Sequence, residues 1–319
     1  MQSFCWDTEM SNTRPTLAEV ISVCSAKDID VWTVASIHVV EFIKAERYTV
    51  IVPDQELELF LSVTSAPYQV KPESQFVGNA KDKIIQKLDI NNQDRVGWYL
   101  QQFVKIAAVL ENDPASTVLI WDADTVPLKP LEFINSEGKL MYYQGEEYRK
   151  SYFDFIELAL GLQRSQSFSF IAQSLTTKVS WAKELFDSLE GSTKMPWMDA
   201  ILFHLNPAEP AGFAEFETLG TWIWHHHQCD IIVTDRPWYR NGQSLVGNPM
   251  KLSKSAWKGL AKSYDFISFE AWDKRPGLRN ALKTILRKFW YGLQGRLLID
   301  NGKIKILFRL QGGCECLKI

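Results

Sequence analysis

Residues 118–125 read Val-Leu-Ile-Trp-Asp-Ala-Asp-Thr, an apolar run that ends in two acidic residues. The run predicts a buried β-strand, and Pro127 and Pro130 predict that the chain turns soon afterwards. Asp122 and Asp124 would then stand where a strand meets a loop. Carboxylates in such a place can bind Mg²⁺ or Mn²⁺, which prefer oxygen ligands and keep positions for water and phosphate. Aspartates also serve as turn or capping residues at strand exits, but this placement favours the metal site.

The sequence on the N-terminal side of this stretch alternates between strand and helix patterns. Strands are predicted at residues 20–24, 48–52 and 68–70, and helices at 31–43, 55–61 and 96–110, the last with Asp94 as N-cap. This alternation predicts an α/β fold with a mixed or parallel sheet flanked by helices. Ligands of such sheets bind beyond the carboxyl ends of the strands. We therefore expect Ser25, Lys27 and Asp28, which follow the first strand, to meet the same ligand as the two aspartates.

The pattern after Pro130 is mixed. Strands are predicted at residues 140–143 and 168–171, and helices at 177–189 and 197–205. Near the C-terminus, residues 297–299 and 304–310 flank Asp-Asn-Gly-Lys at 300–303, which predicts a β-hairpin.

Composition indicates an ordinary globular protein. Of 319 residues, 46% are hydrophobic and 23% are charged. No run of about eighteen apolar residues indicates a membrane-spanning helix, and the first residues lack the pattern of a secretory signal. Five scattered cysteines favour a reducing compartment over a disulfide framework. We expect a cytoplasmic protein, and nothing in the chain points to a nucleic-acid partner.

The charge is distributed unevenly along the chain. Residues 251–319 carry 15 Lys/Arg against 5 Asp/Glu, whereas residues 1–250 carry 20 against 33. This shift predicts a catalytic domain over 1–250 and a basic C-terminal extension over 251–319. Residues 277–294 form an amphipathic helical pattern with Arg279, Lys283 and Arg287 beside or opposite its apolar stripe. The helix either docks on the catalytic body or lies on the inner face of an anionic membrane as a peripheral anchor.

Two enzyme classes fit the apolar run followed by Asp-x-Asp. In phosphatases of the haloacid-dehalogenase type, the first aspartate attacks phosphorus and the second acts as acid and base. That chemistry also needs a downstream lysine and an acidic pair that binds magnesium, and no such acidic pattern follows Asp124. The phosphatase is therefore the second candidate. A third possibility is a catalytically inactive scaffold that binds anions or nucleotides.

Residues 96–105, Val-Gly-Trp-Tyr-Leu-Gln-Gln-Phe-Val-Lys, followed by residues 118–124, resemble glycosyltransferases of the GT-A fold that carry an Asp-x-Asp motif. The resemblance extends over residues 20–227 and points to a bacterial group linked with surface-polysaccharide synthesis. Residues 213–220 are similar to that group's Ser-Glu-Tyr-Glu-x-Tyr-Gly element, with Ala214, Phe216 and Leu219 in place of hydroxyl-bearing residues. The resemblance implies a hexosyl- or related transferase with a nucleotide-sugar donor, a Mn²⁺ or Mg²⁺ ion, and a saccharide or lipid-linked acceptor.

Three acidic residues are candidates for catalysis. If residues 213–217 are extended, Glu215 and Glu217 point to the same side. One of them would act as general base on the acceptor hydroxyl or would stabilise an oxocarbenium-like transition state. The alternative is that both are solvated on an edge strand; the resemblance favours Glu215. Asp199, near the start of a predicted helix, is a further candidate, and its alternative is an ordinary surface acid.

The remaining candidates surround the same chemistry. His225 and His227 share a face if their segment is a strand, and the resemblance suggests one of them as a further metal ligand. Lys105 would reach the donor phosphate or support Asp122. We expect Gln102 and Trp121 beside the donor as well. Tryptophans are frequent in this part of the chain, and aromatic faces stack on sugar rings, so Trp197 and Trp222 are candidates for acceptor binding.

Overall fold

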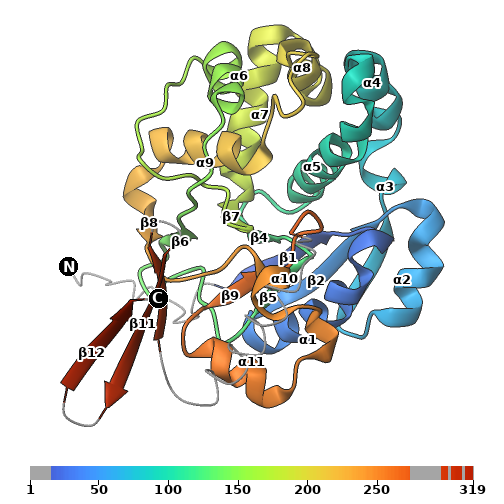
Figure 1. The fold of residues 1–319 in the computed structure, drawn as a ribbon. Coiled ribbons are helices and arrows are strands. Elements are labelled where there is room, and N and C mark those ends of the chain that lie inside the picture. The colour runs from blue at the N-terminus through green and yellow to red at the C-terminus, as the bar shows by residue number, and fades with distance from the viewer. Residues whose placement is uncertain (1–15, 274–295, 301–302, 311–312, 319) are drawn as a thin grey trace, which may run out of the picture.

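The computed structural model describes residues 16–273, 296–300, 303–310 and 313–318, and the structural statements below concern these residues. Figure 1 shows a central sheet with α1 (Ile29–Phe42) and α2 (Leu57–Val63) at one end of the molecule and a group of helices at the other. None of the described helices combines the length and the apolar character needed to cross a bilayer.

Five strands form the central sheet in the order β3-β2-β1-β4-β7. Their bounds are β1 Leu17–Val23, β2 Ala45–Val52, β3 Tyr68–Pro72, β4 Thr117–Trp121 and β7 Ser174–Lys178. The first four strands run parallel, whereas β7 pairs antiparallel with β4 and places Ser174 opposite Trp121. The expected α/β class with a mixed sheet flanked by helices is confirmed.

The sheet is buried on both faces, and successive side chains of a strand point to opposite faces and so enter different cores. Ile21 of β1 and Ile120 of β4 contribute to the hydrophobic core that contains α5 (Val96–Leu110). Their neighbours Val20 and Leu119 belong to the core on the other face, which includes residues of α1. Continuous apolar runs are what a parallel sheet covered on both faces requires, so the strand residues alone position the two helical layers.

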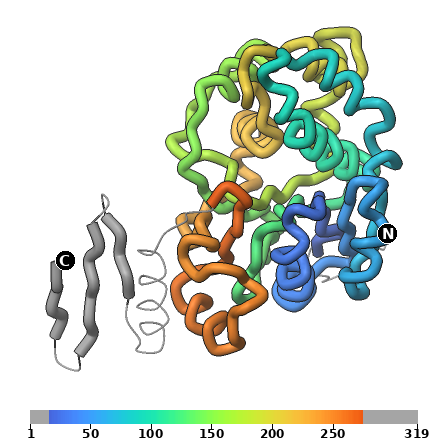
Figure 2. Tube along the Cα trace, turned by 45° about the vertical axis from the view of Figure 1, so that its right-hand side comes forward, coloured from blue at the N-terminus to red at the C-terminus, as the bar shows by residue number. Residues whose placement is uncertain are grey.

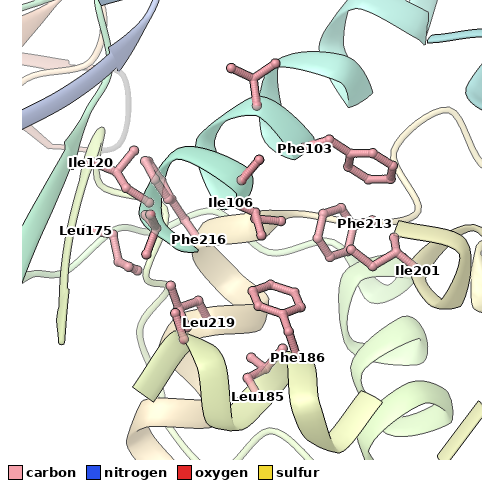
Figure 3. Close-up of a cluster of buried hydrophobic side chains, with 14 of the residues drawn as sticks. Phe103, Ile106, Ile120, Leu175, Leu185, Phe186, Ile201, Phe213, Phe216 and Leu219 are labelled. Atoms are coloured by element: carbon pink, nitrogen blue, oxygen red, sulfur yellow. The ribbon is translucent and has the colours of Figure 1, made fainter. Parts of the chain in front are cut away.

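The helices above the α5 face form one packed layer. Their bounds are α3 Ser74–Val77, α4 Ala80–Lys87, α6 Lys150–Leu160, α7 Val179–Thr193, α8 Trp197–His204 and α9 Glu215–His226. Figure 3 shows the centre of this layer, where side chains of α5, α7, α8 and α9 interdigitate: Phe103, Ile106, Leu185, Phe186, Ile201, Phe216 and Leu219. The layer fixes α5 and α9 beside the end of β4.

The shorter elements complete the described chain. The strands are β5 Thr125–Pro127, β6 Leu140–Tyr143, β8 Ile231–Thr234 and β9 Phe266–Ser268, and the remaining α-helices are α10 Gly242–Val246 and α11 Lys254–Ala261. Single 3₁₀ turns are η1 Ala26–Asp28, η2 Asp54–Glu56, η4 Gln228–Asp230 and η5 Pro249–Lys251, and η3 Ile90–Arg95 is longer.

Three local predictions are wrong. Residues 168–171 form no strand, and residues 213–217 are not extended, because α9 begins at Glu215. The backbone N–H of Glu215 donates to Gln102 Oε1 at 2.9 Å, a tertiary contact that the local pattern does not contain. Asp94 is not the N-cap of α5, since it lies inside η3, which continues directly into that helix.

The predicted division at residue 250 does not match the packing. β9 pairs antiparallel with β5 and places Ile267 opposite Val126. Leu260 and Phe269 share a hydrophobic cluster with Val31 of α1, and the orange segment that contains them lies beside α1 and β5 in Figures 1 and 2. Residues 254–273 are therefore part of the body that contains the sheet.

The C-terminal hairpin is confirmed in its pairing. β10 (Arg296–Asp300) runs antiparallel to β11 (Lys303–Leu310) and places Asp300 opposite Lys303. A third strand, β12 (Gly313–Lys318), pairs with β11. The amphipathic pattern of residues 277–294 lies outside the described residues, so its docking or membrane role stays a prediction.

Candidate active site

A cleft of about 630 Å³ lies at the carboxyl ends of the parallel strands. Ser25, Lys27 and Asp28 line it after β1, and Asp122 and Asp124 line it after β4. β1 and β4 are neighbours in the sheet, so their carboxyl ends meet at one edge. The crevice beyond such an edge is where open α/β sheets bind ligands. The structure thus brings together the two loops that the sequence singled out.

Main-chain hydrogen bonds hold the two aspartates in a tight turn. The N–H of Thr125 donates to the carbonyl of Asp122 at 3.0 Å, and the N–H of Asp122 donates to the carbonyl of Gln173 at 3.0 Å. The N–H of Phe269 donates to the carbonyl of Asp124 at 2.8 Å. The turn is therefore fixed from both sides, by the segment before β7 and by the segment after β9.

Negative charge accumulates around Asp124. Removal of water from its carboxylate, together with the charges of Asp122, Glu270 and Asp28, raises the pKa of Asp124 to about 8. Two hydroxyl groups, of Thr125 and Ser268, lie 3.3 Å from its Oδ1 as weak donors. A carboxylate in this environment gains from any cation that enters the cleft.

Lys105 connects the end of β4 to the start of α9. Its ammonium group donates to Asp122 Oδ1 at 2.6 Å and to Glu215 Oε1 at 2.7 Å, and it lies 4.4 Å from the centre of the Phe216 ring. The side chain is almost fully buried, and its two acidic partners raise the Lys105 pKa above its ordinary value, against the effect of burial. Glu215 lines the cleft in the first turn of α9. Lys105 therefore orients the carboxylates of both Asp122 and Glu215.

A second group of charged residues lines the cleft on the side of β7. The carboxylate of Glu270 accepts hydrogen bonds from Arg240, Trp272 and, at 3.0 Å, Gln173 Nε2. Arg240 also forms an ion pair with Glu147. No sequence pattern predicts any of these five residues as part of a site. Glu270 and Trp272 are two positions apart, but the other three come from distant segments, so only the fold brings the five together.

Three of the predicted residues do not line the cleft. Gln102 and Trp121 lie behind residues at its wall, and Asp199 lies away from it. Gln102 is buried and binds the N–H of Glu215, so it supports the start of α9. Trp121 is buried between Phe133 and Phe266 and donates its indole N–H to the carbonyl of Thr125. Asp199 forms an ion pair with Lys83 at 2.7 Å, which ties α8 to α4.

The two tryptophans predicted for acceptor binding belong to the helical layer. Trp197 packs edge-on against Phe103 and tilted against Phe186. Trp222 lies over His226 on α9, with ring centres 4.0 Å apart. Neither residue lines the cleft. Their aromatic faces contribute to the packing of the helical layer, as tryptophan rings commonly do in protein cores.

Glu217 and the histidines also point elsewhere, because their segment is a helix. Two residues along an α-helix lie about 200° apart, so Glu217 faces away from Glu215. It is fully buried, and its carboxylate accepts hydrogen bonds from Ser169 and from the N–H of Phe170. His225 binds the carbonyl of Gln163 at 2.8 Å, and His227 binds Glu184 at 2.7 Å; neither lines the cleft.

The carboxylates of the cleft suit a hard divalent cation that takes its remaining ligands from water and from a bound substrate. Within residues 16–273, no group of three or more His, Cys, Asp or Glu side chains is arranged around one point as a complete metal site. Mg²⁺ in proteins is commonly held by one or two carboxylates, with waters and substrate phosphates as the other ligands. Asp124, which lacks a basic ion-pair partner among the described residues, and Asp122 could supply those carboxylates.

The sequence matches the family of unknown function DUF6492 over residues 29–263. The chain belongs to this family. The matched range includes α1 to α11 and every cleft residue named above except Ser25, Lys27, Asp28, Glu270 and Trp272. No curated protein matches the sequence.

Solved structures similar to this DUF6492 member include glycosyltransferases. Mouse xyloside xylosyltransferase 1 in its apo form is 12% identical with a TM-score of 0.42; the match covers 81% of this chain and 99% of that one. The bifunctional glycosyltransferase WbbM is 11% identical with a TM-score of 0.39, and 81% of this chain matches 46% of it. The glycosyltransferase GlyE of Streptococcus pneumoniae TIGR4 is 10% identical with a TM-score of 0.35, over 88% and 61% of the two chains.

Proposed function

We propose that the chain is a metal-dependent glycosyltransferase that uses a nucleotide-diphosphate sugar as donor. The observation that carries this proposal is the position of Asp122 and Asp124 in one cleft with Ser25, Lys27 and Asp28, at the carboxyl ends of β4 and β1. The cleft is large enough for such a donor, since small-molecule sites are typically about 300–1,000 Å³. The resemblance of residues 96–105 and 118–124 to Asp-x-Asp glycosyltransferases supports the same reaction.

The roles of the residues follow from their charges. Asp124 and Asp122 hold a Mn²⁺ or Mg²⁺ ion, and the ion when bound neutralises the charge of the departing nucleotide diphosphate. Lys105 keeps Asp122 pointed at that position through its 2.6 Å contact. Ser25, Lys27 and Asp28 contact the nucleotide side of the donor. Stabilisation of developing charge by groups already in place is commonly the largest part of such catalysis.

Glu215 is the carboxylate that we assign to the sugar. It lines the cleft, and Lys105 fixes one of its oxygens on the same ammonium group that holds Asp122. In that position Glu215 either accepts the proton of the acceptor hydroxyl or stabilises an oxocarbenium-like transition state. The acceptor is a saccharide or a lipid-linked saccharide, and the resemblance to the bacterial group suggests surface-polysaccharide synthesis.

The phosphatase alternative has less support. A haloacid-dehalogenase phosphatase takes its lysine from the chain after the nucleophile, and among the described residues no lysine from beyond Asp124 lines the cleft. Lys105 comes from the helix before the strand. A catalytically inactive scaffold would differ from the proposed glycosyltransferase only by its lack of turnover. This alternative therefore predicts nucleotide binding without release of sugar from any donor.

The substitution Asp124→Asn tests the proposal. We expect Mn²⁺-dependent binding of UDP, GDP or CDP to fall at least about tenfold, because one of the two metal carboxylates is lost. Sugar transfer should fall below detection. At pH 7 and without metal the fold should become more stable, on the order of 1 kcal/mol, because the asparagine removes a carboxyl whose pKa of about 8 in the folded protein lies well above its unfolded value. Isothermal titration calorimetry of the three nucleotides, with and without Mn²⁺, gives the first result, and thermal unfolding gives the second.

Asp199→Asn is the matched control, since it changes an acid of the same size in the ion pair with Lys83, away from the cleft. It should leave nucleotide binding unchanged. Wild-type binding and transfer by the Asp124→Asn protein would contradict the metal assignment. Binding without turnover of any UDP-, GDP- or CDP-sugar by the wild type would favour the scaffold.

A further inference from the structure

Trp272 stands out because it is exposed at the wall of the cleft. Trp272 is 62% exposed, and no other tryptophan of the described chain is strongly exposed. Trp272 lines the cleft together with Glu270. Burial of a large aromatic surface is favourable, so a ligand that covers the indole beside this polar cleft would gain binding free energy from the contact.

The indole is held in one orientation. Its N–H donates to the carboxylate of Glu270, and the same carboxylate accepts hydrogen bonds from Arg240 and Gln173. The guanidinium of Arg240 also lies 5.7 Å from the centre of the indole ring. A side chain fixed before binding loses little conformational entropy when a ligand stacks on it. The wall at Trp272 is therefore prearranged.

The sheet order places this wall on one particular side of the aspartates. At the carboxyl edge, β1 and β2 lie on one side of β4 and β7 lies on the other. Gln173 directly precedes β7 and connects to Glu270, so Glu270 and Trp272 belong to the β7 side. Ser25, Lys27 and Asp28 belong to the β1 side. A ligand bound across Asp122 and Asp124 would thus have its nucleotide on one side and its sugar, with the acceptor, on the other.

The polar groups around the indole suit a carbohydrate. Glu147, Arg149, Arg240 and Tyr152 line the cleft on this side. A sugar ring presents C–H groups on its faces and hydroxyl groups on its edge, which can both donate and accept hydrogen bonds. An aromatic face matches the first, and carboxylates, guanidinium groups and a phenol match the second.

We propose that Trp272 is the stacking platform of a saccharide subsite, and that this subsite takes a sugar ring of the acceptor. The inference rests on the proposed function and makes it more specific, because it selects an acceptor whose reactive end is a sugar. Glu147 and Arg240 are the partners for its hydroxyl groups. This subsite replaces Trp197 and Trp222, which pack in the helical layer.

Three variants test the subsite: Trp272→Ala, Trp272→Phe and, as the control, Leu158→Ala. Phenylalanine keeps a smaller aromatic face and loses the N–H that donates to Glu270. Leu158 is 65% exposed on α6, so its truncation removes a similar exposed apolar group away from the cleft. The probes are the methyl glycosides of glucose, galactose, mannose, rhamnose and N-acetylglucosamine, whose binding is measured by ligand-observed NMR with Mn²⁺ and UDP, GDP or CDP present. Calorimetry measures nucleotide binding separately.

We expect at least one glycoside to bind the wild-type protein. Trp272→Ala should weaken that binding about tenfold or more, which corresponds to about 1.4 kcal/mol, while Trp272→Phe and Leu158→Ala stay within about threefold. Nucleotide binding should be the same in all four proteins.

Three outcomes would overturn the inference: no glycoside binds the wild type, the alanine variant binds it equally well, or the alanine variant loses nucleotide binding instead. The last outcome would mean that the indole stacks on a nucleobase. Failure of the proposed function is a separate result, because it would appear as absence of Mn²⁺-dependent nucleotide binding in the wild type.

Discussion

Gln173 has an unusual backbone for a residue with a side chain. Its φ is 62°, and among the described non-glycine residues only Lys194, with a φ of 60°, shares this left-handed conformation. Left-handed backbone costs a non-glycine residue roughly 1–2 kcal/mol. Gln173 makes contacts through its backbone and through its side chain. Its backbone carbonyl accepts a hydrogen bond from the N–H of Asp122, and its side-chain amide donates one to Glu270. The strained residue therefore joins the turn that contains Asp122 and Asp124 to the wall at Trp272.

Replacement of Gln173 by glycine should separate strain from function. Glycine removes the left-handed penalty but also the hydrogen bond to Glu270, so we expect the free energy of unfolding to change by less than about 1 kcal/mol. Sugar transfer should fall about tenfold or more, because small displacements of a site are costly to catalysis. Chemical denaturation measures the first quantity, and the rate of donor turnover measures the second.

Lys194→Gly is the control for this prediction. Lys194 ends α7 on the surface and does not line the cleft. Its replacement should stabilise the protein by about 1 kcal/mol with unchanged turnover. Equal turnover in the two glycine variants would show that the amide of Gln173 has no part in the site.

Helix α9 has a buried acid in its first turn. Glu217 is fully buried beside the segment at residues 166–170, and burial raises its pKa to about 7 in spite of the hydrogen bonds from Ser169 and Phe170. An unfolded glutamate ionises near pH 4.5. Between these two values the unfolded chain loses its proton while the folded protein keeps it. Stability from this group is thus full below pH 4.5 and is lost as the pH rises through 7.

The substitution Glu217→Gln should remove this pH dependence. The wild-type protein is expected to lose roughly 3 kcal/mol from this group between pH 4.5 and pH 8. The glutamine variant should be more stable than the wild type at pH 8 and should show a smaller decrease over the same range. Urea unfolding at pH 5, 6, 7 and 8 measures both curves, and other titrating groups cancel in their difference. Parallel curves would contradict the assignment.

The sequence predicted elements well where local pattern determines them. The four parallel strands and α5 follow from apolar periodicity, and the hairpin of β10 and β11 follows from Asp-Asn-Gly-Lys. It failed at residues 213–217, where alternating apolar and acidic residues read as a strand. In the folded protein Gln102 binds the N–H of Glu215 and Lys105 binds its carboxylate, so contacts from α5 fix the start of a helix there. Tertiary contacts of this kind leave no local signal.

The candidate site shows the same division. Asp122, Asp124 and Lys105 could be predicted because they lie within 20 residues of one another and border a strand. Glu270, Arg240 and Trp272 could not, since each is an ordinary residue in its own segment. They acquire a common place only because β9 pairs with β5, which brings a segment from beyond residue 265 next to Asp124.

The whole molecule depends on this late segment for its packing as well as for its cleft. Leu260, Phe266, Ile267 and Phe269 are buried against the body, and burial of each such side chain contributes on the order of 2 kcal/mol. A chain that ends after Met250 should therefore be unable to fold, whereas a chain that ends after Asp273 should unfold cooperatively and bind nucleotide with Mn²⁺. Circular dichroism on heating and calorimetry test both chains. A shorter chain with the melting temperature of the longer one would show that β9 is dispensable.

The pairing of β9 with β5 also has a consequence for the order of events at the ribosome. The turn that contains Asp124 is synthesised about two fifths of the way along the chain, but the N–H of Phe269, which binds its carbonyl, is added more than 140 residues later. Until that amide has left the exit tunnel, the nascent polypeptide has the two aspartates without the wall opposite them. The proposed sugar transfer would therefore begin only after translation has passed the last strand of the body.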